Sequence, residues 1–184
     1  MTSLKGQLLV ASARLLDPNF MQSVVLMVQH DLNGALGLVL NRPTELSLRQ
    51  AWEQVSESLC QREDSLYIGG PCEGVLMAIH PFASAGQIEI LPGLYFATET
   101  QHMEWLMQQR DEKQMRFFVG YSGWTAGQLE GEIDSGSWTS SAATLERVFA
   151  SEQTLWRQIK REISLESIMG KVNPRLIPGD PSMN

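Results

Sequence analysis

The feature that most constrains the possible folds of this chain is a series of short apolar runs separated by turn residues. The longest unbroken runs are of the size of Val24–Val28 and Ala35–Leu40. The turn signals between such runs are Asp17-Pro18-Asn19, Asn33-Gly34, Gly69-Gly70-Pro71 and Pro92-Gly93. This spacing is typical of short strands joined by tight turns, and the runs fall far below the ~20 residues that span a bilayer. We therefore expect many short elements and no membrane role.

The chain is long enough to bury its own core. It has 184 residues and a mass of 20.6 kDa, a size at which folding buries roughly 70% of the unfolded surface. The hydrophobic fraction of 43% and the charged fraction of 19% exclude general disorder and a coiled coil. We expect a single domain over residues 1–169. Residues 170–184 contain several prolines and no periodicity, so we expect a loosely ordered tail there.

The net charge of -7 is concentrated in the middle of the chain. Residues 43–113 hold 11 carboxylates and four basic side chains. The nearest basic cluster, formed by Arg157, Lys160 and Arg161, is flanked by glutamates and is typical of a solvated helix face. This balance disfavours partners whose affinity comes from neutralising phosphates, so we expect no direct nucleic-acid binding.

Cysteine use and the start of the chain indicate a cytoplasmic protein. Cys60 and Cys72 are the only cysteines, and neither has a close partner of the kind that a zinc knuckle or redox pair requires. The run Leu8–Val10 after Lys5 is too short for a secretory signal, which needs about 7 to 15 apolar residues.

The N-terminal third predicts strands. Residues 7–12 and 23–29 are rich in Leu and Val with little polar alternation, so we expect both strands to be covered on two faces. Asn33-Gly34 favours a hairpin that leads into the run 35–40. Further short strands, expected to form an antiparallel meander, are 66–68, 75–79, 88–91 and 94–97, and 116–121 indicates another buried strand.

Helical spacing is clearest after Ser47, a plausible N-cap. One buried helix face is predicted to contain Leu48, Ala51, Trp52, Val55 and Leu59. A second helix capped by Thr100 and a third from about Thr125 follow, and the pattern is helical again past Trp138. Because strands and helices mix without regular βαβ alternation, the sequence predicts an α+β fold with a mostly antiparallel or mixed sheet.

The segment Gly120-Tyr121-Ser122-Gly123-Trp124 invites comparison with the nucleophile elbow of hydrolases, which needs a second glycine after the serine. Trp124 occupies that place. A tight strand-to-helix turn with aromatic packing is therefore favoured over a serine nucleophile.

Gly69-Gly70-Pro71 has two interpretations. It resembles part of a phosphate-cradling loop, but no Gly-x-x-x-x-Gly-Lys follows, so a turn between strands is favoured. The neighbouring Cys72 lies beside Glu73, which disfavours a reactive thiolate.

The three histidines have no local metal-binding spacing. His30 and His80 each end a predicted strand, and they could converge with Asp17 or Asp31 to form an acid/base pair or a metal site. The alternative, which we favour, is that they bond to the backbone of turns. His102 lies at the start of a predicted helix.

Several of these motifs together resemble the YqgE/AlgH family of bacterial proteins. The resemblance covers about residues 6–163 and is carried by Ala11-Ser12 to Phe20, Ser23-Val24-Val25, His30, Asn33-Gly34-Ala35 to Asn41-Arg42-Pro43, Gly69-Gly70-Pro71, His80, Gly120 to Trp124, Gly127-Gln128-Leu129-Glu130, Glu132 and Trp138. This chain departs from the family at Ala13, Cys72 and Ser122, so Cys72 and Ser122 are poor candidates for a shared catalytic residue.

The resemblance implies a fold and points to the role assigned to the family. It implies an α+β domain whose mixed, mostly antiparallel, bifurcated sheet curls into a pseudo-barrel with helices packed outside. The family is labelled a transcriptional regulator through a genetic connection with alginate production.

Two functions follow from these residues. The first is a non-enzymatic regulatory module that binds a small molecule or a protein and acts indirectly on gene expression, with no cofactor and no metal. The alternative is a hydrolase or nucleotide-acting enzyme that uses a His/Asp cluster with the Gly-rich turns. The sequence favours the first. The candidate cluster consists of Asp17, His30, Asn41, Gly69, Gly70, His80, Tyr121, Gly123 and Trp124. If these residues line one cleft, the enzyme is favoured, and if they are dispersed, the motifs are folding devices.

Overall fold

A branched sheet forms the centre of the structure, a computed structural model that describes residues 2–110 and 114–169. The expected tail at 170–184 lies outside these described residues. The strands are β1 (Gln7–Ala11), β2 (Val24–Asp31), β3 (Gly34–Val39), β4 (Pro43–Ser47), β5 (Ser65–Ile68), β6 (Cys72–His80), β7 (Ile88–Leu91), β8 (Leu94–Ala97), β9 (Arg116–Thr125) and β10 (Trp138–Ala142). The helices are α1 (Leu48–Trp52), α2 (Thr100–Leu106), α3 (Gln128–Asp134), α4 (Leu145–Val148) and α5 (Glu152–Met169), with a 3₁₀ turn η1 (Ala83–Ala85).

Strand β9 is the point at which the sheet divides. Its C-terminal half pairs with β3, and its N-terminal half pairs with β5 on one side and β6 on the other. The main path runs β10-β1-β2-β3-β9-β6-β8-β7, and β4 joins through β5. Only the β5–β9 pairing is parallel among the described strands. The predicted mixed, mostly antiparallel and bifurcated sheet is confirmed.

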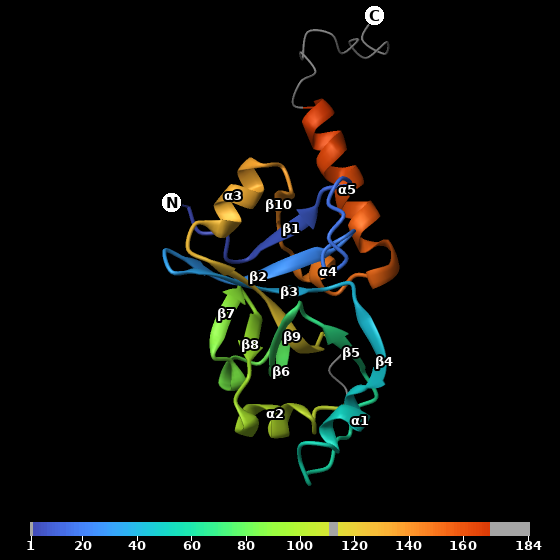
Figure 1. Cartoon of the computed structure of the whole chain (residues 1–184). Helices are drawn as coiled ribbons and strands as arrows, with labels where there is room; N and C mark the ends of the chain where they lie inside the picture. Colours follow the sequence, from blue (N-terminus) through green and yellow to red (C-terminus); the bar gives the residue numbers. More distant parts are fainter. Residues whose placement is uncertain (1, 111–113, 170–184) are drawn as a thin grey trace, which may run out of the picture.

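The sheet curls so that its two ends approach each other. A Cβ on Gly6, just before β1, would lie 2.9 Å from the carbonyl oxygen of Ile90 in β7. Side chains from β1, β2, β3, β5, β6, β7, β8 and β9 meet in one buried cluster, to which helices α4 and α5 also contribute. Helices α1 and α2 lie at one end of the molecule, and α3, α4 and α5 lie around the other (Figure 1).

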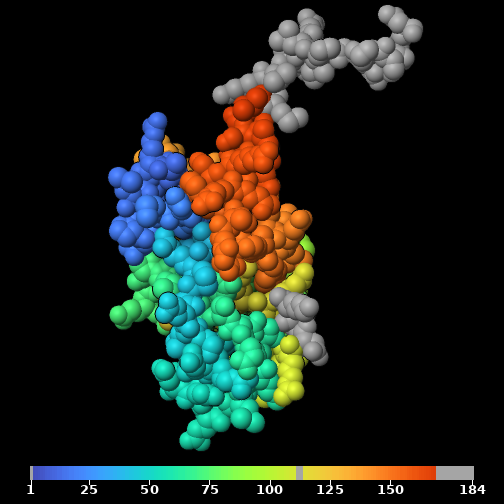
Figure 2. All heavy atoms as spheres, turned by 90° about the vertical axis from the view of Figure 1, so that its right-hand side faces the viewer, coloured from blue at the N-terminus to red at the C-terminus, as the bar shows by residue number. Residues whose placement is uncertain are grey.

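The first two strands are buried on both faces, as predicted. Leu8 and Val10 of β1 point into the pseudo-barrel, whereas Leu9 and Ala11 pack in a second cluster that also contains Leu129 of α3. A third cluster lies between the β5–β9–β6 region and helices α1 and α2. In Figure 2 the C-terminal helices (orange to red) lie beside the N-terminal segment (blue).

Two helix predictions need correction. Ser47 caps α1 as predicted, in a capping box with Gln50, but the helix ends at Trp52 and leaves Val55 and Leu59 exposed. The Trp52 indole N–H donates to the carbonyl oxygen of Ser58, and serine hydroxyls bond the backbone in this segment and compete with the helix. Thr100 is the first residue of α2 rather than its cap.

Two strands were missed, and the expected antiparallel meander forms only in part, because β7 and β6 both pair with β8 but β5 lies elsewhere. Strands β4 and β10 are too polar to give an apolar signal, and both are edges of the sheet. Strand β5 pairs with β4 and β9 rather than with β6. In the described part of the chain, no helix is long and apolar enough to cross a membrane.

Candidate functional site

Two tryptophans and one glutamate organise the densest set of motif residues. The indole N–H groups of Trp124 in β9 and Trp138 in β10 both donate to the same Oε2 of Glu132 in α3, at 2.9 and 2.8 Å. The Phe20 ring lies 6.1 Å from the Trp124 ring and 5.3 Å from that of Trp138, between centroids. Gln128 donates to the other oxygen of Glu132 at 3.0 Å. We call Phe20, Trp124, Glu132 and Trp138 the indole–glutamate cluster.

His30 is held beside this cluster by hydrogen bonds on both sides of its ring. Nδ1 accepts the backbone N–H of Leu4 at 3.0 Å, so the proton resides on Nε2, which donates to Glu130 of α3 at 3.0 Å. The side chain is 2% exposed. Both nitrogens are therefore used to tie the N-terminal segment and α3 to β2, and neither is available for acid/base work. The favoured interpretation, a bond to nearby backbone, fits this geometry.

His80 lies elsewhere, at the far end of the pseudo-barrel. It pairs with Tyr95 in β8. The preceding residue, Ile79, pairs with Arg116, which lies at the opposite end of β9 from Trp124. The ring is fully buried between Phe82 and Tyr95, and its Nε2 has no hydrogen-bond partner among the residues described. His30 and His80 therefore share no pocket.

Burial lowers the pKa of His80 from 6.5 to about 4, and the charge of His102 adds to this effect. On acidification the unfolded chain takes up the proton first. We predict that the stability contributed by neutral His80 is complete above about pH 6.5 and is lost as the pH falls towards 4.

The loss of unfolding free energy between about pH 7 and pH 5 should be about 2 kcal/mol larger in the wild type than in His80→Gln. Urea denaturation at both pH values measures it. The control His102→Gln should keep most of the pH dependence because burial is the larger cause. Equal pH dependence in the wild type and His80→Gln would contradict the assignment.

The glycine motif is a place where backbones pass closely, and it does not cradle an anion. The N–H of Gly69 donates to the carbonyl oxygen of Val119 at 3.0 Å, and the Gly69 carbonyl oxygen accepts from Val39 at 2.9 Å. A Cβ on Gly69 would lie 2.3 Å from the carbonyl oxygen of Gly120, and one on Gly70 would lie 2.3 Å from the backbone of Tyr121. These glycines allow the sheet to divide.

Ser122 is sealed by the same contact. Its side chain is fully buried, and its Oγ donates to the carbonyl oxygen of Gly69 at 3.0 Å. The expected strand-to-helix turn at this motif is wrong, because β9 continues through Thr125 and the chain turns at Gly127, where φ is +76°. The Tyr121 ring packs against Gly74 and Gly123. A serine nucleophile does not fit this geometry.

Asp17 and Asn41 shape a loop. The Asp17 carboxylate accepts the N–H of Asn19 at 2.8 Å, and its carbonyl accepts from Phe20 and Met21. Asn41 accepts the N–H of Val24 at 2.9 Å and donates to the carbonyl oxygen of Gln22 at 2.9 Å. The candidate residues thus fall into separate groups, and the predicted single cluster is not formed.

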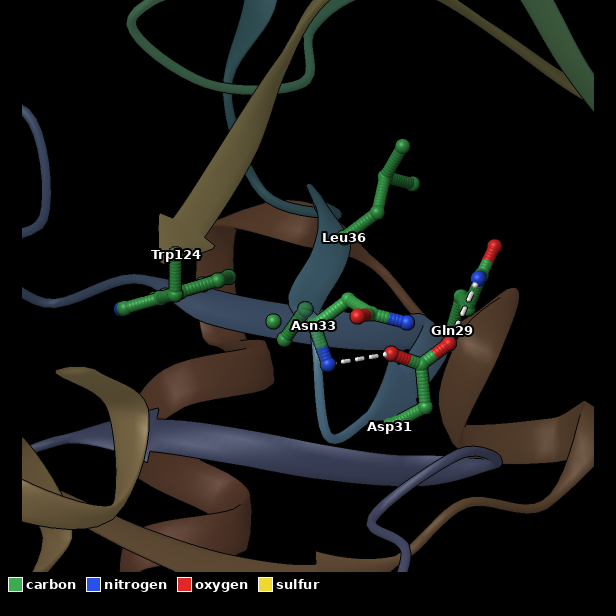
Figure 3. Close-up of a pocket in the computed structure, with 7 residues that line it drawn as sticks. Gln29, Asp31, Asn33, Leu36 and Trp124 are labelled. Atoms are coloured by element: carbon green, nitrogen blue, oxygen red, sulfur yellow. Dashed lines mark hydrogen bonds between the residues drawn. The ribbon is translucent and has the colours of Figure 1, made fainter. Parts of the chain in front are cut away.

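A pocket that the sequence did not indicate opens at the β2–β3 hairpin. Its volume is about 280 Å³, and it is lined by Gln29, Asp31, Asn33, Gly34, Ala35, Leu36 and Trp124. Figure 3 shows Trp124 on one side, with its indole nitrogen directed away, and Asp31 and Gln29 on the other. We call it the hairpin pocket. The sequence marks Asp31, the Asn33-Gly34 turn and Trp124 separately, and only the fold brings them to one pocket.

The carboxylate of Asp31 is the charged group of this pocket. A hydrogen bond from the Gln29 amide at 3.0 Å and one from the Asn33 N–H at 2.7 Å lower the pKa of Asp31. The group therefore stays ionised at neutral pH. In residues 2–110 and 114–169, no group of three or more His, Cys, Asp or Glu residues could hold a metal ion.

Together, fold and site define an α+β protein with a divided, curled sheet whose motif residues anchor α3. The model of the AlgH-like family matches residues 8–167. The chain therefore belongs to the AlgH-like family, as the resemblance to YqgE/AlgH proteins implied.

Comparisons with individual relatives support this family assignment. The chain is 35% identical to the UPF0301 protein of Chlorobaculum tepidum over 97% of this chain and 95% of that one. It is 34% identical to the UPF0301 protein of Myxococcus xanthus, over 92% and 96%. The solution structure of the AlgH protein from Pseudomonas aeruginosa superimposes with a TM-score of 0.71 at 30% identity, covering 97% of this chain and 95% of that chain.

Proposed function

We propose that the protein is a non-catalytic binding module of the cytoplasm, and that its hairpin pocket receives a lysine or arginine side chain of a protein partner. The observation that carries this proposal is the pocket itself. It places an ionised carboxylate across from the indole of Trp124, in a volume of about 280 Å³.

The two walls suit a basic side chain. Lysine and arginine combine an apolar stem with a cationic head. Trp124 and Leu36 offer apolar surface to the stem, and Asp31 offers a charged acceptor to the head. The net charge of -7 would also steer a basic partner towards the chain.

Several groups that an enzyme could use are held in hydrogen bonds of the fold, and His80, whose Nε2 has no partner among the described residues, is fully buried. His30, Glu132 and Ser122 all have their polar atoms in hydrogen bonds that hold strands or helices together. This supports binding over catalysis. A regulatory effect would then be indirect, through the partner, rather than through DNA.

The test is an NMR titration of the ¹⁵N-labelled protein with the peptide N-acetyl-Gly-Arg-Gly-amide. We expect saturable amide shifts at residues 29–36 and at the Trp124 indole, and none with the same peptide carrying glutamate in place of arginine. Asp31→Asn keeps an acceptor for the Asn33 N–H and should weaken binding about two- to fivefold, as for an exposed ion pair.

Asp134→Asn is the matched control, because it removes the same charge from an exposed position at the end of α3. It should leave the affinity unchanged. Shifts that map elsewhere, or equal affinities for both variants, would overturn the proposal.

A further inference from the structure

Arg116, the first residue of β9, is a buried arginine with an unusual environment. Only 6% of it is exposed. Its Nη1 donates to the carbonyl oxygen of Leu40 at 2.9 Å and its Nη2 to that of Ala150 at 3.1 Å. The guanidinium lies 4.7 Å from the ring centroid of Tyr67 and 6.0 Å from that of Phe149.

This charge lacks a direct counter-ion. Among the residues that the structure describes, no carboxylate oxygen lies within 4.0 Å of the Arg116 guanidinium. The other buried arginine, Arg62, differs: its guanidinium holds both oxygens of Asp64, at 2.7 and 2.9 Å. A buried charge is costly unless it is paired. Of these two buried arginines, Arg116 is therefore the one whose charge a bound anion would compensate.

A cavity of about 200 Å³ lies beside the guanidinium. Its lining consists of Asp64, Ser65, Tyr67, Met115, Arg116 and Phe149. Burial raises the pKa of Tyr67, so its phenol keeps its proton and can donate a hydrogen bond. The Ser65 hydroxyl adds a second possible donor, and the negative charge of Asp64 is already paired with Arg62.

The backbone adds positive potential on the same side. The 18-residue helix α5 begins at Glu152, two positions after the Ala150 carbonyl that holds the guanidinium. The N-terminal end of a helix carries a partial positive charge. Burial lowers the pKa of Arg116, and the charges of Tyr67 and of Glu152 in the first turn of α5 partly offset this.

We infer that this cavity, the Arg116 pocket, binds a compact oxyanion, namely a phosphate group, through the Arg116 guanidinium and the hydroxyls of Tyr67 and Ser65. Three of the five guanidinium N–H donors are not used by the two carbonyl oxygens. A volume of about 200 Å³ suits one phosphate group. The site is separate from the hairpin pocket, because Arg116 and Trp124 lie at opposite ends of β9.

The test is a titration of the full chain followed by ¹⁵N NMR. Inorganic phosphate and glycerol 3-phosphate are compared with sodium chloride at equal ionic strength. We expect saturable shifts of the Arg116 Nε–H and of the Ser65, Tyr67 and Phe149 amides. Tighter binding of glycerol 3-phosphate would identify a phosphomonoester as the ligand, and equal or weaker binding would identify free phosphate.

Arg116→Met should weaken phosphate binding at least about tenfold. Arg49→Met is the control, because it also removes one positive charge, from an exposed pair with Glu63, and should change nothing. Tyr67→Phe keeps Arg116 and should weaken binding about threefold, which tests the inference even if Arg116→Met fails to fold. The absence of saturable shifts at these positions, or unchanged affinity in both Arg116→Met and Tyr67→Phe, would overturn it.

Discussion

Replacing Gly70 with alanine is expected to destabilise the protein by on the order of 4 kcal/mol and to lower its Tm by about 10 °C. The added Cβ would lie 2.3 Å from the backbone carbon of Tyr121 and 2.4 Å from the nitrogen of Ser122. Both contacts are with the backbone of β9, where the sheet divides, so neither neighbour can move without breaking strand pairs. Urea denaturation and a thermal melt followed by circular dichroism measure the effect.

Gly93→Ala separates this clash from conformational strain. Gly93 also has positive φ, +79°, but a Cβ there would meet nothing within 4 Å. Its replacement should cost only about 1 kcal/mol. If Gly70→Ala proved as stable as Gly93→Ala, the predicted clash between a Cβ at position 70 and the backbone of β9 would be contradicted.

Removing the Glu132 carboxylate should have the second large effect. Glu132→Ala leaves the buried indole N–H groups of Trp124 and Trp138 without their acceptor. Each unsatisfied donor costs about 1–3 kcal/mol, so we expect a total loss of about 3 kcal/mol or more. The near-ultraviolet circular dichroism of the tryptophans should weaken together with the stability.

Two further variants serve as controls for Glu132→Ala. Glu132→Gln retains an oxygen acceptor and should lose only about 1 kcal/mol. Asp134→Ala removes an exposed carboxylate from the same helix and should be nearly neutral. A Glu132→Ala protein as stable as Asp134→Ala would show that the indole–glutamate cluster does not anchor α3.

Local patterns in the sequence predicted much of the fold. The hairpin at Asn33-Gly34, the cap at Ser47 and the double burial of β1 and β2 depend on residues that are neighbours in the chain. Strand β10 was missed because its polar residues at 139–141 give no apolar signal and pair with β1, more than a hundred residues away. The exposure of Val55 and Leu59 shows that helical spacing alone does not keep a helix intact.

The sites depended on contacts that spacing does not reveal. The resemblance drew attention to Trp124, Glu132 and Trp138, but only the fold shows that both indoles share one carboxylate oxygen. Arg116 stood in the sequence as an ordinary charge before a buried strand. In the fold, strands and helices from distant segments surround Arg116. Only this arrangement shows that no described carboxylate contacts its guanidinium.

The most direct test of the binding function is a crystal structure of the protein soaked with N-acetyl-Gly-Arg-Gly-amide. We predict that the guanidinium of the peptide lies within hydrogen-bond distance of the Asp31 carboxylate, with its methylene groups against Trp124. Crystals of Asp31→Asn should show lower occupancy under the same conditions. A peptide bound elsewhere, or a hairpin pocket that stays empty at peptide concentrations that saturate the NMR shifts, would contradict the proposed function.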